Sequence, residues 1–324
     1  MKPGLVLIPG IRKCGTTTLY DMLAENPQLF TLKDLKESQI FCLKRADFKR
    51  NIDKLTSEMD SSGTFLDAST LALYSSNAIA NIKSHFEKVK IVFIIRKPQT
   101  RFVSAYMHNV KKGNKIENRT LKEVIEAFKK DENNSAIELS ELEKAKSSGK
   151  INYRKIEFPN LNSKYKSRIE EGIDEDFTQL KYYRESCYSA YIEKWENEFG
   201  KENCLVISLE ELRFDTEKAL KKVTNFLRLE NPLEIQLKSS NMTYMANSFL
   251  ARTMRQLFRI IGLNRLVKKS TLLKSGVLKI RAKIYDKEKI NNSESYRREL
   301  DYLFSEEMAY WENRSPEIYK YWMS

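Results

Sequence analysis

Near its N-terminus the chain carries a loop whose residue types suit an anion. A short apolar run, Leu5–Ile8, leads into Gly10-Ile-Arg-Lys-Cys-Gly-Thr-Thr-Thr-Leu19 and then into a predicted helix, Leu19–Glu25. A strand, a glycine-containing loop and a helix in this order bind phosphate-like groups, because the free N–H groups of the loop and of the first helical turn converge on one anion. The sequence therefore predicts an anion site directly after the first strand.

This loop departs from a nucleoside-triphosphate P-loop at the positions that carry its chemistry. Gly10 and Gly15 have the P-loop spacing, but Thr16 stands where the phosphate-binding lysine belongs. The cations of this loop, Arg12 and Lys13, lie inside it instead. The loop thus keeps the glycine spacing that binds an anion, but its positive charges lie at other positions than in a P-loop.

A second apolar run, Ile91–Ile95, is also followed by residues that suit an anion. It ends in Arg96, where an NTPase would need an acidic partner for magnesium. Since a cation cannot ligate a cation, we expect an anion site that works without a metal. Pro98 starts the next predicted helix, and Ser104 lies eight residues after Arg96, so that a guanidinium and a hydroxyl can surround one further phosphate.

These two segments, about eighty residues apart, resemble the phosphosulfate loop and the 3′-phosphate motif of sulfotransferases that use 3′-phosphoadenosine 5′-phosphosulfate (PAPS). The resemblance is strongest to the heparan-sulfate-type and bacterial carbohydrate branches. It implies that Lys13 neutralises charge on the leaving phosphate and that 3′-phosphoadenosine 5′-phosphate (PAP) is the product. It also implies two sets of donor-binding residues: Arg12, Lys13, Gly15, Thr16, Thr17 and Thr18 for the 5′-phosphosulfate, and Arg96 and Ser104 for the 3′-phosphate.

The reaction also needs a base for the acceptor proton. The segment Lys36-Glu37-Ser-Gln-Ile-Phe41 resembles the Lys-Glu segment that carries the catalytic carboxylate in heparan-sulfate-type members, which implies Glu37 as the base. Two alternatives stay open. His108 lies one helical turn after Ser104, and Asp67 follows a short apolar run.

The predicted fold is α/β: a P-loop-like three-layer arrangement with a central, mostly parallel sheet flanked by helices, plus a helical insertion. The 324 residues, 41% of them hydrophobic, are long enough for one domain spanning 1–324. The polar segment 111–182 is interpreted as a solvated helical insertion or as a lid over the acceptor. Beyond it the pattern predicts a helix within Ser186–Phe199, a strand at Cys204–Ile207 and a helix at Thr216–Leu227.

The chain has 57 basic and 44 acidic residues, a net charge of +13, and much of the excess lies in the segment 235–285. That segment contains eleven Lys and Arg and no Asp or Glu. We interpret it as a basic amphipathic helical region for an acceptor or nucleotide, an anionic polymer or a membrane surface, with a plain solvated helix as the alternative. No motif predicts specific nucleic-acid binding.

The four cysteines show no CxxC pairing, and the two histidines have no clustered ligands, so the sequence predicts no zinc site. Cys14 is interpreted as a small filler rather than an activated thiol, and His85 is predicted to be exposed. No apolar stretch reaches the roughly 18 residues of a membrane span, and the first strand begins at once, so a cytoplasmic, bacterial protein is expected, with peripheral membrane association as the alternative.

The leading hypothesis is a PAPS-dependent sulfotransferase that acts on a carbohydrate hydroxyl. Sulfation of a small natural product at oxygen or nitrogen is the alternative within the same chemistry. An ATP- or GTP-dependent kinase is disfavoured by Thr16 and Arg96. A non-enzymatic polyanion-binding protein, using the region 235–285, is the remaining alternative.

Overall fold

The structure is a computed structural model. The basic region 235–285 and most of the segment 111–182 lie outside the residues it describes, which are 4–32, 35–56, 63–111, 117, 119–126, 182–230 and 296–324.

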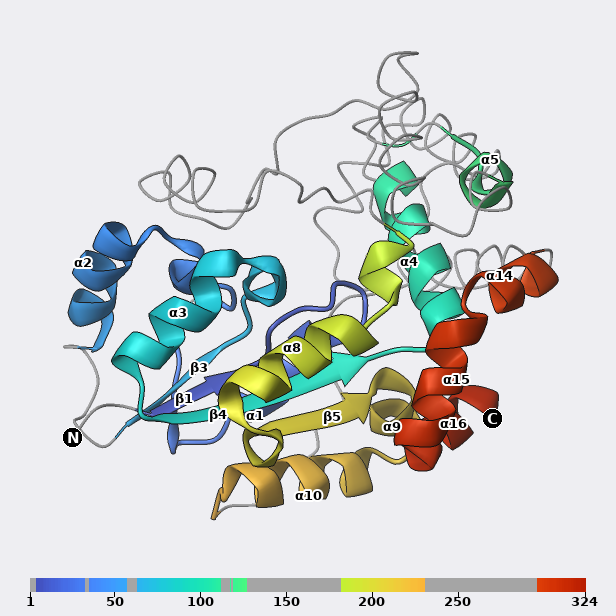
Figure 1. Cartoon of the computed structure of the whole chain (residues 1–324). Coiled ribbons are helices and arrows are strands. Elements are labelled where there is room, and N and C mark those ends of the chain that lie inside the picture. Colours follow the sequence, from blue (N-terminus) through green and yellow to red (C-terminus); the bar gives the residue numbers. More distant parts are fainter. Residues whose placement is uncertain are drawn as a thin grey trace, which may run out of the picture.

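The described residues form one sheet of five parallel strands (Figure 1). The strands lie in the order β2-β3-β1-β4-β5. The apolar runs of the sequence account for the longer ones, which confirms the predicted parallel sheet. The strands are β1 (Gly4–Leu7), β2 (Leu29–Phe30), β3 (Thr64–Asp67), β4 (Lys88–Ile95) and β5 (Cys204–Ser208).

Helices follow or separate these strands, and two of them begin where the sequence predicts: at Pro98 and at Thr216. Proline suits a first helical turn because its missing N–H would have no intrahelical partner there. The helices are α1 (Thr16–Leu23), α2 (Arg45–Thr56), α3 (Ser76–His85), α4 (Pro98–Lys111), α5 (Leu121–Glu126), α8 (Ser189–Phe199), α9 (Leu209–Phe214), α10 (Thr216–Leu227), α14 (Arg297–Leu303), α15 (Ser305–Arg314) and α16 (Pro316–Met323).

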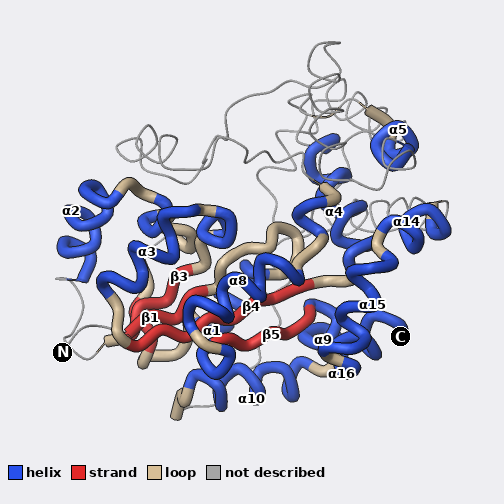
Figure 2. Tube along the Cα trace, in the orientation of Figure 1, coloured by secondary structure: helices blue, strands red, loops and turns tan. Residues whose placement is uncertain are grey.

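The sheet separates two hydrophobic cores, and Figure 2 shows helices on both of its faces. Successive strand side chains point to opposite faces, so Leu5 and Leu7 enter one core while Val6 enters the other. The first core also holds Trp195 of α8, and the second holds Leu220 of α10. Both faces of the strands are therefore buried, which confirms the three-layer α/β fold.

The order of the strands creates a place for a ligand. β1 lies between β3 and β4, so the chain leaves β1 toward one side of the sheet and later continues on the other. The loops that follow these parallel strands emerge at the same, carboxyl edge. In open α/β sheets this change of direction opens a crevice at the carboxyl ends of the strands. The predicted anion loop follows β1, and Arg96 follows β4.

Polar contacts join the C-terminal helices to the sheet domain, among them those made by Glu307 and by Lys97. Glu307 of α15 accepts hydrogen bonds from the backbone N–H groups of Tyr188 (2.7 Å) and Ser189 (3.0 Å) at the start of α8. The Nζ of Lys97 donates to the carbonyl oxygen of Trp322 in α16 (2.8 Å). Within the described residues, no helix has both the length and the apolar character needed to cross a membrane.

Candidate active site

The loop after β1 has a backbone that only glycine allows at one position. Gly15 has a φ of 98°, and a Cβ placed on it would lie 2.6 Å from the Cδ1 of Leu209 in α9. Gly15 is also the N-cap of α1, and it has no side chain with which to bond the first-turn N–H groups. These donors are left to an external acceptor, as an anion site requires.

The two predicted motifs meet at this loop. The Nη1 of Arg96 donates to the carbonyl oxygen of Lys13 (3.3 Å), and its Nε donates to the Oγ1 of Thr100 (3.1 Å). Ser104 lies one turn of α4 beyond Thr100, on the same helical face, and is buried. The adjacent parallel strands β1 and β4 therefore bring the loop and the Arg96 segment into direct contact.

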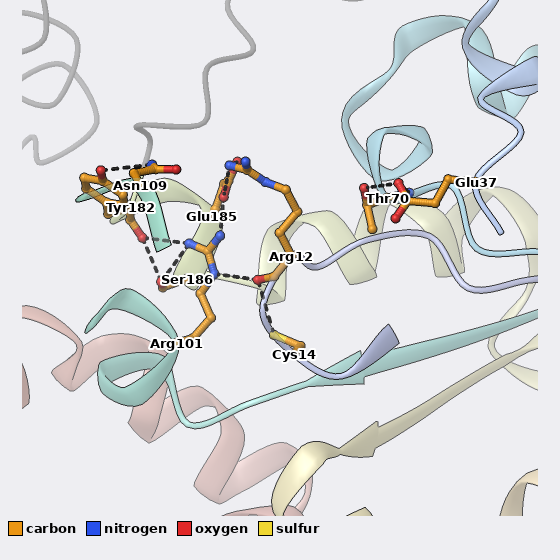
Figure 3. Close-up of polar contacts among 9 residues, drawn as sticks. All are labelled: Arg12, Cys14, Glu37, Thr70, Arg101, Asn109, Tyr182, Glu185 and Ser186. Atoms are coloured by element: carbon orange, nitrogen blue, oxygen red, sulfur yellow. Dashed lines mark hydrogen bonds and ion pairs between the residues drawn. The ribbon is translucent and has the colours of Figure 1, made fainter. Parts of the chain in front are cut away.

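Arg12 faces a partner that sequence reasoning missed. Its Nη2 lies 2.6 Å from the Oε1 of Glu185, in the 3-10 segment Arg184–Ser186. The same carboxylate pairs with Arg101 of α4, which is fully buried and also donates to the carbonyl oxygen of Arg12 (3.0 Å; Figure 3). This cluster fixes the backbone of the loop, and it directs the guanidinium of Arg12 toward Glu185.

A further cation lies over the start of α1. The Nζ of Lys36 is 3.2 Å from the Oγ1 of Thr16 and 3.2 Å from the Oγ1 of Thr17. It is also 3.0 Å from the Oε1 of Glu37. The segment after β2 thus reaches two of the three threonines that the resemblance assigns to the phosphosulfate.

The carboxylate of Glu37 is oriented by several donors and remains accessible. Its Oε2 accepts from the Oγ1 of Thr70 (2.8 Å) and from the Nε2 of Gln39 (3.0 Å), and the Thr70 pair is drawn in Figure 3. The Glu37 side chain is 32% exposed, so a substrate can reach it. These contacts present a fixed carboxylate beside the anion loop.

The two alternative bases have different surroundings. Asp67 is 1% exposed and accepts from the backbone N–H groups of Ser38 (3.0 Å) and Ser69 (2.8 Å). Burial raises the pKa of its carboxyl above the ordinary value. Asp67 therefore connects two loops and has little surface for an acceptor.

The other alternative base, His108, is half-buried. It lies ten residues beyond Pro98, and this separation is about 15 Å along the axis of α4.

Two smaller predictions have clear outcomes. Cys14 is fully buried, and burial raises the pKa of its thiol to about 12, which favours a filler over an activated nucleophile. The prediction that His85 is exposed is wrong. It is half-buried, because its ring packs edge-on against Phe48 and Phe86.

In the part of the chain that the structure describes, no group of three or more His, Cys, Asp or Glu side chains is arranged to hold a metal ion. The described site is instead built from cations, hydroxyls and backbone N–H groups, with carboxylates beside it.

A family model described as a sulfotransferase domain matches residues 3–258. The chain belongs to the sulfotransferase family. It is thus an enzyme of sulfuryl transfer. This membership favours sulfuryl transfer over the alternatives of a kinase and of a non-enzymatic polyanion-binding protein. No curated protein matches the chain.

The chain is similar to several solved sulfotransferases at low sequence identity. A sulfotransferase from Alicyclobacillus acidocaldarius is 17% identical with a TM-score of 0.49, over 83% of this chain and 95% of that one. A sulfotransferase domain from the curacin biosynthetic pathway is 14% identical with a TM-score of 0.40, over 77% and 82%. A mouse sulfotransferase complexed with PAP is 15% identical with a TM-score of 0.36, over 71% and 59%.

The residues that sequence reasoning missed had weak signals. Lys36 directly precedes Glu37, and Thr100 and Arg101 lie within the segment from Arg96 to Ser104. Glu185 follows the long polar segment with nothing in its neighbourhood to link it to the loop. Only the fold connects it to Arg12.

Proposed function

We propose that this sulfotransferase uses PAPS as its donor and transfers the sulfuryl group to a hydroxyl of a carbohydrate-type acceptor. The observation that carries the donor assignment is the contact between the two anion motifs, where Arg96 donates to the carbonyl oxygen of Lys13 (3.3 Å). One ligand with phosphates at both ends would engage both motifs. The donor supplies an activated sulfuryl group and a phosphate leaving group.

The residues present fit such a donor. The first-turn N–H groups of α1 and the hydroxyls of Thr16, Thr17 and Thr18 would hold the 5′-phosphosulfate, together with Lys13 and Gly15. Arg96 and Ser104 would hold the 3′-phosphate. Arg12 would contribute by fixing the loop through Glu185, because its guanidinium already has that partner.

Glu37 is proposed as the base. The acceptor oxygen forms a bond to sulfur while the bond from sulfur to the bridging phosphate oxygen breaks, and that oxygen keeps the electron pair. Glu37 takes the acceptor proton, and Lys13 neutralises the charge that develops on the leaving phosphate. The accessibility of Glu37 supports this role over the buried Asp67.

The carbohydrate acceptor rests on the resemblance of the loop and of the segment Lys36–Phe41 to the heparan-sulfate-type and bacterial carbohydrate branches. A small natural product with a hydroxyl or amine is the second candidate. Three further proposals rest on the sequence alone. We propose that residues 1–324 form a single domain, that the segment 111–182 acts as a lid over the acceptor, and that the region 235–285 binds an anionic polymer or a membrane surface.

Calorimetric titration with PAP, with and without a chelator, tests the donor assignment. We expect tight binding that does not depend on magnesium, and weak binding of ATP. Absence of PAP binding would overturn the proposal. A labelled-donor assay over saccharides, hydroxyl compounds and amines then identifies the acceptor, and transfer to amines alone would contradict the carbohydrate assignment.

A further inference from the structure

One lysine of the described site, Lys36, contacts residues from both halves of the proposed reaction. The Nζ of Lys36 contacts the hydroxyls of Thr16 and Thr17 (both 3.2 Å) and the carboxylate of Glu37 (3.0 Å). An ammonium has three hydrogens, and these three oxygens accept them. Lys36 therefore connects the proposed donor site to the proposed base.

The backbone holds Lys36 at this point. Its carbonyl oxygen accepts from the N–H of Ala68 (3.0 Å), directly after β3, and the N–H of Ser38 is bound by Asp67 (3.0 Å). The Lys36 side chain is 18% exposed. The ammonium is thus preorganised by two anchors and is screened from most of the solvent, which strengthens its field.

The transferred group must pass between the donor phosphate and the acceptor oxygen. The threonines would bind the phosphosulfate, and Glu37 would receive the acceptor proton, so the sulfuryl oxygens must lie between them. Lys36 touches both sides of that gap. A hydroxyl that accepts from Lys36 also keeps its own hydrogen to donate to an anion.

We propose that Lys36 is a further catalytic residue: with the donor bound, its ammonium turns one of the hydrogens that Thr16 and Thr17 accept here toward a sulfuryl oxygen, and it keeps the Glu37 carboxylate beside that oxygen. The inference rests on the proposed function. During transfer the bond between sulfur and the bridging oxygen breaks and the bond from the acceptor oxygen forms, while the proton goes to Glu37. The fixed ammonium of Lys36 stabilises the negative charge of the sulfuryl oxygens, and Lys13 acts on the leaving phosphate.

The test compares two ligands that differ by the sulfuryl group. Affinities for PAPS and PAP are measured by calorimetry without acceptor, for the parent protein and for Lys36→Met, Lys36→Arg and Lys83→Met. Lys83 is an exposed lysine of α3 that pairs with Glu198, and it serves as the matched control. Lys36→Gln replaces the methionine variant if the latter does not fold.

We expect Lys36→Met to weaken PAPS binding about tenfold relative to PAP, the value of one charge-assisted hydrogen bond. Its kcat should fall on the order of 10²-fold. Lys36→Arg should restore most of the PAPS preference, and Lys83→Met should leave it unchanged.

A purely structural Lys36 would affect PAPS and PAP binding equally, or neither, and either result would overturn the inference while leaving the proposed function intact. If the parent protein binds neither ligand, both the proposed function and the inference fail.

Discussion

Two adjacent cations of the anion loop have different surroundings. The guanidinium of Arg12 is paired with Glu185 at 2.6 Å, whereas Lys13 has a left-handed φ of 73° and its carbonyl oxygen accepts from Arg96. Position in the loop therefore does not decide which cation faces the donor. The contact with Glu185 gives Arg12 a supporting role in the loop, and the chemical role proposed for Lys13 is tested by substitution.

Lys13→Ala should lower kcat on the order of 10²–10³-fold while the protein still folds, because one preorganised positive group is lost from the developing charge. Alanine keeps the Cβ, so the left-handed backbone is no more strained than with lysine. Turnover of labelled donor and a thermal melt measure the two effects. A kcat within a few-fold of the parent, with Lys83→Ala as the surface control, would remove Lys13 from the reaction.

Glu37→Gln should lower kcat roughly 10²–10⁴-fold and leave the affinity for PAP nearly unchanged. The amide keeps the shape of the side chain and can still accept from Thr70, but it cannot take the acceptor proton. His108→Ala and Asp67→Asn are the comparisons. A deeper loss of kcat in His108→Ala, with PAP still bound, would transfer the role of base to the histidine.

At the scale of elements, the loop after β1 depends on segments that arrive much later in the chain. Arg101 of α4 donates to the carbonyl oxygens of Arg12 and of Tyr182, and it is ion-paired with Glu185. One carboxylate thus balances a fully buried guanidinium and holds α4, the loop and the segment Arg184–Ser186 together.

Glu185→Gln should lower the free energy of unfolding by about 3–5 kcal/mol, because it leaves the Arg101 charge buried without its counter-ion. Urea denaturation measures this loss. Glu198→Gln removes one partner of an exposed pair, Lys83–Glu198, and should cost less than about 1 kcal/mol. Equal effects of the two substitutions would show that the Arg101 charge is compensated by its other partners.

At the scale of the whole molecule, the C-terminal helix α15 contacts the start of α8 through the buried carboxyl of Glu307. Glu307 also accepts from the Oγ of Ser189 (2.7 Å) and from the Nε1 of Trp311 (2.7 Å). Burial raises the pKa of this carboxyl above its ordinary value of 4.5, in spite of the hydrogen bonds from Ser189 and Trp311, which lower it. The folded state therefore binds the proton up to a higher pH than the unfolded chain does.

This difference predicts a pH dependence. As the pH rises from 4.5 through the raised pKa of Glu307, the folded state holds more protons than the unfolded state, so this group's contribution to stability falls. Glu307→Gln keeps four hydrogen bonds, since its amide can donate to the Ser189 hydroxyl, and it does not titrate. We expect the stability of Glu307→Gln relative to the parent to increase with pH in urea denaturation. A relative stability that decreases with pH would contradict the raised pKa.

The sequence by itself determined the features that depend on neighbours along the chain. Apolar runs predict strands because a buried parallel strand must be apolar on both faces, and the glycine spacing of the loop reports a backbone that bulkier residues cannot adopt. The parallel sheet, the helix starting at Pro98 and the glycine-containing loop between the first strand and α1 were all predictable for these reasons.

Only the tertiary structure decided which side chains meet. Glu185 reaches Arg12 across 173 positions of sequence, and Lys36 reaches Thr16 across 20. Such contacts depend on the order of the strands, which places loops from distant segments at one edge of the sheet. The same packing buries Asp67 and leaves Glu37 accessible, because the burial of a carboxylate is set by the elements that surround it in space.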